Sequence, residues 1–261
     1  MNIDGGVDMS VGQADQSQII ETPVLLEEDL HASIFRWRPL LGETGDQVDM
    51  RLLGGAKLGP EGLDLSSPDA FSHYTLPTAP LAEIIQTSGE ISVRLWVKST
   101  RDDQGGPARI FTWSKSTDLR NLTLGQGTYD QENNGLSLRV RLDLVDDPSA
   151  RQGQAAGDDL LNTTDDLFKV DHGWYHLVAQ YRRDGHVELW VNGDMISRVF
   201  EPVGLSSWDP LFNFALGQEL SDNQPPEAPL RSWSGIIAEV AIYPVSLSRQ
   251  EILTYVAGGA R

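Results

Sequence analysis

The sequence contains no cysteine among its 261 residues. Disulfide bonds, thiolate metal sites and a cysteine nucleophile are therefore excluded. The absence does not assign a compartment, because a protein without cysteine can reside in an oxidising or a reducing environment.

Long apolar runs are also missing. A membrane-spanning helix needs ~20 consecutive apolar residues, whereas the candidate segment GIIAEVAIYPV is shorter and contains Glu239. We therefore expect no membrane insertion. The stretch Met1–Gln18 is polar and does not have the pattern of a signal peptide. We expect the chain to be either cytoplasmic or a mature or excised piece of an exported protein.

Basic residues are scarce relative to acidic ones. The chain has 20 Lys and Arg against 38 Asp and Glu, which gives a formal net charge of −18. Such a field repels phosphate backbones, so a nucleic-acid partner is not expected. It attracts cations, and Asp-rich loops commonly supply Ca²⁺ ligands. The alternative interpretation is that the charge serves only solubility.

Short alternating segments dominate the sequence after about residue 54. In ISVRLWVKS, residues Ile91, Val93, Leu95 and Val97 share one face, as expected for a β-strand. The pair Asp184-Gly185 separates two alternating runs and predicts a hairpin, and Asn192-Gly193 predicts the next turn. Ten or more such strands indicate an all-β, two-sheet antiparallel β-sandwich of the jelly-roll type.

One short helix is predicted near the C-terminus. Ser248 and Glu251 have the spacing of a capping box, and Leu247 and Ile252 have that of a hydrophobic staple. We divide the chain into a flexible or extended N-terminal segment, residues 1–53, and a jelly-roll domain, residues 54–261.

Residues 54 to 259 resemble a laminin G-like domain of the concanavalin A-like lectin/glucanase superfamily. The resemblance lies in GWYHLVAQYRRDGHVELWVNG, LGQ and WSGIIAEVAIYPVSLSRQEILTYVAGG, and the earlier GLDLSSPDAFSHYTLP and EISVRLWVK match the opening strands. The matching positions are Trp174, His176, Leu189, Val191, Asn192, Gly193, Leu216, Gly217, Gly235, Glu239, Ile242, Tyr243, Leu247 and Ser248. The segments RNLTLGQGTYD, LSSWDP and ALGQEL are similar to a bacterial subgroup whose domains often accompany c-type cytochromes or other exported modules.

The resemblance implies export, to the cell surface, the periplasm or the exterior, and a binding or adhesive role without a particular ligand. We predict a non-catalytic module that recognises carbohydrate or a protein partner. One alternative is a structural or interaction module of a larger exported assembly, such as one associated with a cytochrome. Another is a polysaccharide hydrolase or lyase.

An enzyme is the less favoured interpretation. Retaining glycoside hydrolysis needs two carboxylates ~5–5.5 Å apart. The closing strand IAEVAIYP carries one carboxylate, Glu239, where the hydrolases of the superfamily place several. We therefore expect no catalytic residues.

Four polar or aromatic residues are candidates for ligand binding. Trp208 and Trp233 lie in loop-like segments, where they are either exposed to stack on sugars or close the ends of the sandwich. Gln126 and Gln218 belong to two similar phrases, NLTLGQGTYDQ and NFALGQELSDN. His176 is expected to be a hydrogen-bonded core residue rather than a metal ligand.

The repeated phrase allows two interpretations. Packing alone would require the shared Leu-Gly, whose glycine permits close backbone approach. The functional interpretation places the copies on neighbouring strands and their polar tails at one rim, where oxygen ligands would hold Ca²⁺. The predicted metal ligands are Asp130, Asp209, Asp222 and Asn223.

Overall fold

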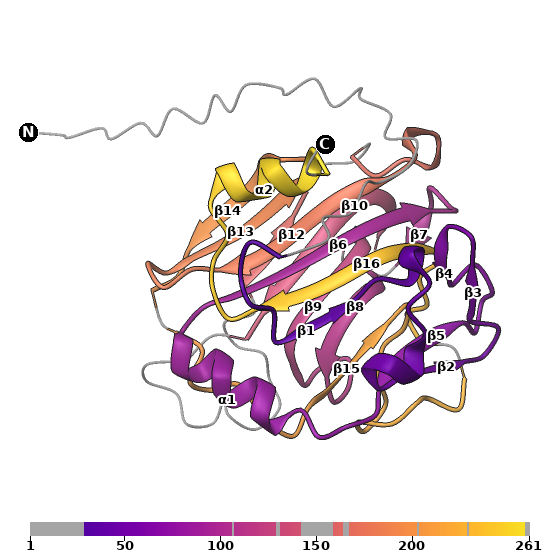
Figure 1. Cartoon of the computed structure of the whole chain (residues 1–261), viewed down its shortest axis with the longest axis horizontal. Coiled ribbons are helices and arrows are strands. Elements are labelled where there is room, and N and C mark those ends of the chain that lie inside the picture. The colour runs from indigo at the N-terminus through magenta and orange to yellow at the C-terminus, as the bar shows by residue number, and fades with distance from the viewer. Residues whose placement is uncertain are drawn as a thin grey trace, which may run out of the picture.

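The computed structural model describes residues 29–105, 107–128, 131–141, 159–163, 167–202, 204–228 and 230–258. Two antiparallel sheets pack face to face and form a β-sandwich (Figure 1). The predicted all-β architecture is therefore confirmed.

Each sheet contains eight strands within the described residues. The β6 sheet has the order β14 (Asp194–Phe200), β13 (His186–Val191), β12 (Tyr175–Tyr181), β6 (Ile91–Ser99), β16 (Gly235–Tyr243), β4 (Gly62–Asp64) and β3 (Lys57–Gly59), and β1 (Phe35–Trp37) also pairs with β16. The β8 sheet has the order β11 (Asp159–Asn162), β10 (Gln131–Val140), β9 (Arg120–Thr128), β8 (Ala108–Ser114), β15 (Asn213–Leu216), β5 (Phe71–Tyr74) and β2 (Met50–Leu53), and β7 (Gln104–Gly105) also pairs with β10.

The core lies between the two sheets and follows the period-two pattern of the strands. On β6, the alternating apolar residues from Ile91 to Val97 are fully buried, as the sequence predicts. The opposite side of the same strand is also buried, since Arg94 and Trp96 are each 1% exposed. The outer face of the β6 sheet is therefore covered by further elements, including the C-terminal helix (Figure 1).

The predicted C-terminal helix is α2 (Arg249–Val256). The Ser248 hydroxyl accepts from the backbone nitrogen of Glu251 at 3.3 Å, and the Glu251 carboxylate accepts from the backbone nitrogen of Ser248 at 2.7 Å. Leu247 and Ile252 are fully buried in one cluster on the outer face of the β6 sheet. The capping box is confirmed, and the burial agrees with the staple.

A second helix, α1 (Ala79–Ser88), was not predicted. Its start has a proline in the first turn and its end has Gly89 in the left-handed region, which is the usual asymmetry of helix ends. Short 3₁₀ turns occur at Pro39–Leu41, Gly45–Val48 and Val170–His172. No helix among the described residues is both long enough and apolar enough to cross a bilayer.

Strands occur on both sides of the boundary expected after residue 53. β1 pairs with β16, placing Phe35 opposite Ile242, and β2 pairs with β5. Asp29 accepts a hydrogen bond from the Tyr243 hydroxyl at 2.8 Å. The first described residue therefore already contacts a strand of the sandwich. Residues 1–28 lie outside the described part of the chain.

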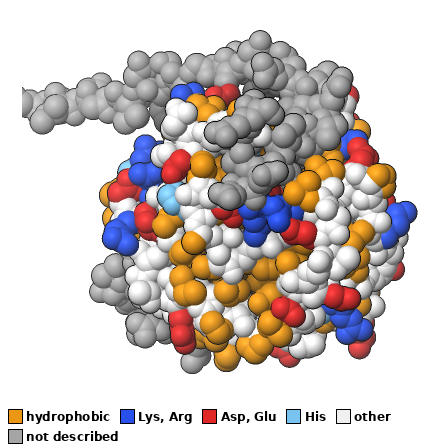
Figure 2. Space-filling model, in the orientation of Figure 1, with side chains coloured by type: hydrophobic (Ala, Val, Ile, Leu, Met, Phe, Trp, Pro, Cys, Tyr) orange, Lys and Arg blue, Asp and Glu red, His pale blue; other side chains and the backbone are white. Residues whose placement is uncertain are grey.

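The β6-sheet side of the molecule has a mixed surface. Figure 2 shows hydrophobic side chains at the surface over the lower half of this face, with acidic and basic side chains interspersed around its margin. The negative net charge therefore does not form a continuous acidic field on the visible part of this side.

Candidate functional site

A continuous row of side chains crosses the outer face of the β8 sheet. Phe111 and Trp113 on β8 point into the core, so Thr112 and Ser114 between and beside them point outward. Strand register extends the row from Thr112 in both directions, as Arg139 (β10), Thr123 (β9), Thr112 (β8), Ala215 (β15), His73 (β5) and Arg51 (β2). Five strand intervals of ~4.8 Å give the row a length of ~24 Å.

The row is open at its ends and closed in the middle. Arg51 is exposed, and His73 and Arg139 are half-buried. Thr112 and Thr123 are 0% and 1% exposed. The Thr123 hydroxyl has no hydrogen-bond partner among the described residues, which is unusual because buried polar groups are normally paired.

Glu219 is the carboxylate at the centre of this face. It is fully buried and accepts from the Arg109 Nε at 2.8 Å, from the Thr112 hydroxyl at 2.9 Å and from the Ser114 hydroxyl. The backbone nitrogen of Leu220 adds a further donor at 3.1 Å. Arg109 is 1% exposed, so the ion pair is almost completely removed from water.

Glu219 belongs to a segment that crosses over β8. The backbone nitrogen of Gly217 donates to the Ile110 carbonyl at 3.2 Å, and that of Asn223 donates to the Lys115 carbonyl at 3.0 Å. Both edges of β8 are already paired, with β9 and β15. The chain between these two contacts therefore passes over the outer face, and we name residues 218–228 the cover segment.

His73 is kept neutral by its surroundings. Burial lowers the pKa of its imidazole below the usual value, and the nearby positive charge of Arg51 lowers it further, against a backbone hydrogen bond that raises it. At neutral pH the imidazole is therefore a hydrogen-bonding group rather than a cation.

Two of the predicted ligand-binding residues, Gln126 and Trp233, are hydrogen-bonded to each other. Trp233 is 1% exposed, and its indole nitrogen donates to Oε1 of Gln126 at 2.9 Å. Gln126 is fully buried and accepts also from Ser99 and Gln104. Neither side chain faces solvent at this end of the sandwich, so of the two alternatives for Trp233 the exposed one does not hold.

Trp208 is buried as well, at 1% exposure. Its indole nitrogen donates to the Arg141 carbonyl at 2.8 Å, and its ring meets Trp113 edge-on with centroids 5.3 Å apart. Of the two interpretations given for these tryptophans, the one in which they close the ends of the sandwich is therefore the one observed. Gln218 is 1% exposed beside Glu219, and its Oε1 has no partner among the described residues.

The two copies of the repeated phrase lie in one sheet but are not neighbours. β9 and β15 flank β8, and both Leu124 and Leu216 are opposite Phe111. A Cβ added to Gly125 would lie 2.5 Å from the Ala108 carbonyl oxygen, and Gly217 has a φ of +86°. The shared Leu-Gly therefore packs against the same central strand, β8, from its two sides. The expectation that the two copies lie on neighbouring strands is wrong, because β8 lies between them.

The predicted metal ligands are not gathered into one described cluster. Asp130 lies outside the described residues. The Asp209 carboxylate accepts from the Leu211 backbone, and Asp222 is exposed and 3.1 Å from Lys115 Nζ. Asn223 donates to the Leu211 carbonyl at 2.9 Å. This bond places the segment of Asp209 and the Asp222-Asn223 turn at the same end of the sandwich.

No group of three His, Asp or Glu side chains suited to a metal occurs among the described residues. Gln126 is opposite Ala108 at the start of β8 and β9 continues from there to Thr128, whereas Asn223 bonds to Lys115 beyond the other end of β8. Among the described residues, the two tails therefore do not meet at one rim. Whether Ca²⁺ binds this chain stays a prediction.

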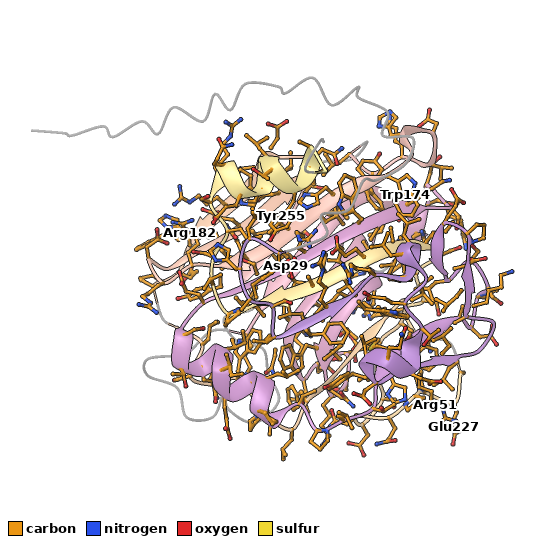
Figure 3. The ribbon with its side chains drawn as sticks, viewed as in Figure 1. Asp29, Arg51, Trp174, Arg182, Glu227 and Tyr255 are labelled. Atoms are coloured by element: carbon orange, nitrogen blue, oxygen red, sulfur yellow. The ribbon has the colours of Figure 1, made fainter. Side chains whose placement is uncertain are left out.

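A second buried ion network lies on the outer face of the β6 sheet. Glu239 is fully buried and accepts from Arg94 at 2.7 and 3.0 Å and from Arg36 at 2.9 Å. Burial opposes the charge on Arg94, but the Glu239 carboxylate raises the pKa of this guanidinium above its usual value. Asp29 and Tyr243 complete the network, and Figure 3 shows Asp29 near the centre of this side. The network joins β1, β6 and β16, and we assign it a structural role.

His176 lies beside this network and is fully buried. Its ring packs against Trp96 with centroids 5.0 Å apart. Neither ring nitrogen has a hydrogen-bond partner among the described residues, so the expected hydrogen bonding is wrong although the burial is confirmed. Burial, with the Arg94 charge, lowers the pKa of His176 well below its usual value.

The sequence did not identify Arg109, Thr112, Ser114 or Glu219 as site residues. A signal was present in the repeated phrase, because Glu219 stands in the second copy where the first copy has Gly127. The positions at which the copies differ, rather than those that they share, mark the outer face.

Comparisons with known proteins agree with this architecture. A family model described as the concanavalin A-like lectin/glucanases superfamily matches residues 69–253. No curated protein matches the sequence significantly.

Solved structures with a similar fold include the CBM40 of the Ruminococcus gnavus IT-sialidase, with a TM-score of 0.54 and 12% identity over 86% of this chain and 100% of that one. The same CBM40 bound to α2,3-sialyllactose has a TM-score of 0.50 and 14% identity, over 71% and 92% of the chains. The binding domain of botulinum neurotoxin DC in complex with SialylT has a TM-score of 0.53 and 14% identity over 79% of this chain. Our chain spans 45% of the length of that toxin domain. These identities establish a shared fold.

Proposed function

This chain belongs to the concanavalin A-like lectin/glucanases superfamily, and on that premise we propose that it is a non-catalytic carbohydrate-binding module. The proposed site is the outer face of the β8 sheet. Its floor consists of Thr112 and Thr123, and its accessible ends consist of Arg51, His73 and Arg139.

The observation that carries the proposal is the unpartnered hydroxyl of Thr123 within a row of polar side chains. Buried hydroxyl groups without partners are rare, because the lost hydrogen bond to water is not replaced. A sugar offers many hydroxyl groups, each able to donate and accept. Thr123 is 1% exposed, so a glycan lying along the row would provide the missing partner once the chain that buries this hydroxyl has moved aside.

The fold neighbours support a glycan rather than a protein ligand. Two of them were solved with sialyl glycans, the R. gnavus CBM40 with α2,3-sialyllactose and the toxin domain with SialylT. At these identities the likeness concerns the fold, so the ligand of our chain follows from its own side chains. A protein partner, or a structural role in a larger exported assembly, is the alternative.

The absence of catalysis is part of the proposal. Glu219 accepts four hydrogen bonds, and within the described ranges it is the one carboxylate that contacts Arg109, Thr112 and Ser114. Hydrolysis by the usual mechanism needs a second carboxylate with a free proton site nearby. Glu239 is on the other sheet and is held by two arginines. A glycan ligand also implies that the module works outside the cytoplasm.

The experiment is a calorimetric titration of the full chain with α2,3-sialyllactose and with lactose, preceded by a glycan array. We expect saturable binding without release of reducing ends or unsaturated products. Thr123→Val removes the hydroxyl at nearly constant volume and should weaken binding without lowering stability, since the hydroxyl has no partner to lose. Saturable binding that Thr123→Val leaves unchanged would contradict the site, and product release would contradict the non-catalytic role.

Calcium is a separate proposal that rests on the common end of Asp209 and the Asp222-Asn223 turn. Calorimetry with Ca²⁺ is expected to give heat that Asp222→Ala removes. Absence of heat in the wild type would remove calcium from the account.

A further inference from the structure

We propose that Arg109, Thr112 and Ser114 form a carboxylate-binding site, which Glu219 occupies in the present structure and which a carboxylated sugar of the glycan occupies when the cover segment moves away. The inference rests on the proposed function for its ligand, but not for the site itself. It makes Glu219 an internal competitor of the ligand.

The donor set has the chemistry of a carboxylate receptor. The Arg109 Nε and the Ser114 and Thr112 hydroxyls all donate to the two oxygens of one carboxylate. A carboxylate accepts and does not donate, so it matches a set that presents only donors toward it. Hydrogen bonds with an ionised partner are also the stronger ones, particularly where water is excluded.

The donors and the acceptor come from different parts of the structure. All three donors are on β8, at the centre of the sheet, with strands paired on both sides. Glu219 comes from the cover segment, which has no named strand or helix. The receptor is therefore fixed in place, while its present occupant is attached to an irregular segment that can open at lower cost.

The closed arrangement leaves some polar groups unsatisfied. Gln218 Oε1 in the cover segment and the Ser232 hydroxyl after it are buried without partners among the described residues, as is the Thr123 hydroxyl on the strand beside β8. Each such group raises the free energy of the closed state. Opening would return the Gln218 and Ser232 groups to water and would uncover Thr112, which is the neighbour of Thr123 in the row.

Exchange of one carboxylate for another conserves the charge balance of the site. Arg109 is 1% exposed, and leaving it without a counter-ion would be costly. A ligand carboxylate can take the place of Glu219, whereas a neutral sugar cannot. The site should therefore prefer carboxylated sugars, because a neutral sugar would leave the buried Arg109 without a counter-ion.

The first test measures the site without a glycan. Glu219→Ala removes the internal carboxylate, and the melting temperature is measured in sodium acetate and in sodium chloride at equal ionic strength. We expect acetate to raise the melting temperature of this variant by several degrees relative to chloride, because a ligand that binds the folded state stabilises it. Glu227→Ala is the matched control, since Glu227 is an exposed carboxylate of the same segment and lies at the margin of the molecule in Figure 3. An equal response of both variants would overturn the proposal.

A second measurement covers the case in which Glu219→Ala does not fold. Hydrogen exchange of the wild type is compared in the same two salts. Acetate should accelerate exchange in residues 218–228 and leave β12 unchanged. Exchange in residues 218–228 that does not differ between the salts would overturn the proposal independently of any variant.

The third measurement separates the inference from the proposed function. Wild type and Glu219→Gln are titrated with methyl glucuronide and methyl glucoside, which differ at one carboxylate. We expect preference for the glucuronide and about tenfold tighter binding in Glu219→Gln, where the competitor has lost its charge. Equal binding of both sugars would overturn the inference and leave the proposed function intact. Failure of all glycans to bind, with acetate rescue present, would overturn the proposed function and support the carboxylate site.

Discussion

The indole nitrogen of Trp233 lies 2.9 Å from Oε1 of Gln126 and donates a hydrogen bond to it. The backbone nitrogen of Trp233 also donates to the Gly217 carbonyl at 2.8 Å. One tryptophan thus joins both copies of the Leu-Gly-Gln phrase, one through its side chain and the other through its backbone. This arrangement assigns Gln126 and Trp233 to the stability of the sandwich end rather than to ligand contact.

Gln126→Leu is expected to destabilise the protein strongly. The substitution leaves the indole N–H of Trp233 without its acceptor and removes one donor from the Arg101 carbonyl, which keeps its hydrogen bond from the Ser99 hydroxyl. A buried group left unpaired costs roughly 1–3 kcal/mol, so we expect a loss of about 2 kcal/mol in a urea titration. Glycan affinity of the folded fraction should not change. A loss below about 0.5 kcal/mol would show that this hydrogen bond does not hold the sandwich end together.

Ser248→Ala should cost about 1 kcal/mol of unfolding free energy, because its hydroxyl caps α2 through the Glu251 backbone. The denaturant midpoint should fall while the slope stays constant. Thr254→Ala is the control, since Thr254 bonds within the helix, to the Gln250 carbonyl, and should change stability by less than about 0.5 kcal/mol. Equal effects of the two substitutions would contradict the capping role.

Mild acid should destabilise the protein through its buried imidazoles. The pKa of His176 in the folded state is held well below its ordinary value of 6.5, by burial and by Arg94. The unfolded chain therefore binds the proton first, and stability is complete above pH 6.5 and falls as the pH decreases below it. One such group contributes about 1.4 kcal/mol of loss per pH unit within that window. His73 adds a contribution of the same sign.

His176→Leu tests this prediction. Because both ring nitrogens lack partners, the substitution should change stability at pH 7.5 by less than about 1 kcal/mol. It should also reduce the loss of stability between pH 7.5 and 5.5, as followed by thermal melting. His73→Gln, measured in the same way, gives the contribution of the other imidazole. If His176→Leu leaves the pH dependence of stability unchanged, His176 is not the titrating group.

The sequence was sufficient for elements that depend on local pattern. The alternation of β6, the Asp184-Gly185 hairpin and the Ser248 capping box depend on residues close together in the chain, and all three are observed. The sequence could not decide whether Trp208 and Trp233 are exposed, because exposure depends on packing between distant segments. Trp208 and Trp233 look like loop aromatics, yet the loops fold inward over the ends of the sandwich.

The site itself was not predictable for a similar reason. Arg109 and Glu219 are 110 positions apart, and only the strand register and the reversal of the chain after Gly217 bring them together. The α1 helix was not predicted because apolar and polar residues are mixed along it without a clear helical period. The proline at its start and the glycine at its end were too weak as signals to indicate a helix on their own.

The glycan footprint tests the central claim most directly. Hydrogen exchange of the full chain is measured with and without α2,3-sialyllactose, in the wild type and in Thr123→Val, with Thr254→Ala as the control on the β6-sheet side. We predict protection in β8, β9 and β10, lost in Thr123→Val and retained in Thr254→Ala, with no change in β12 or β13. Protection confined to the β6 sheet, or protection of β9 that Thr123→Val leaves intact, would contradict a glycan site on the outer face of the β8 sheet.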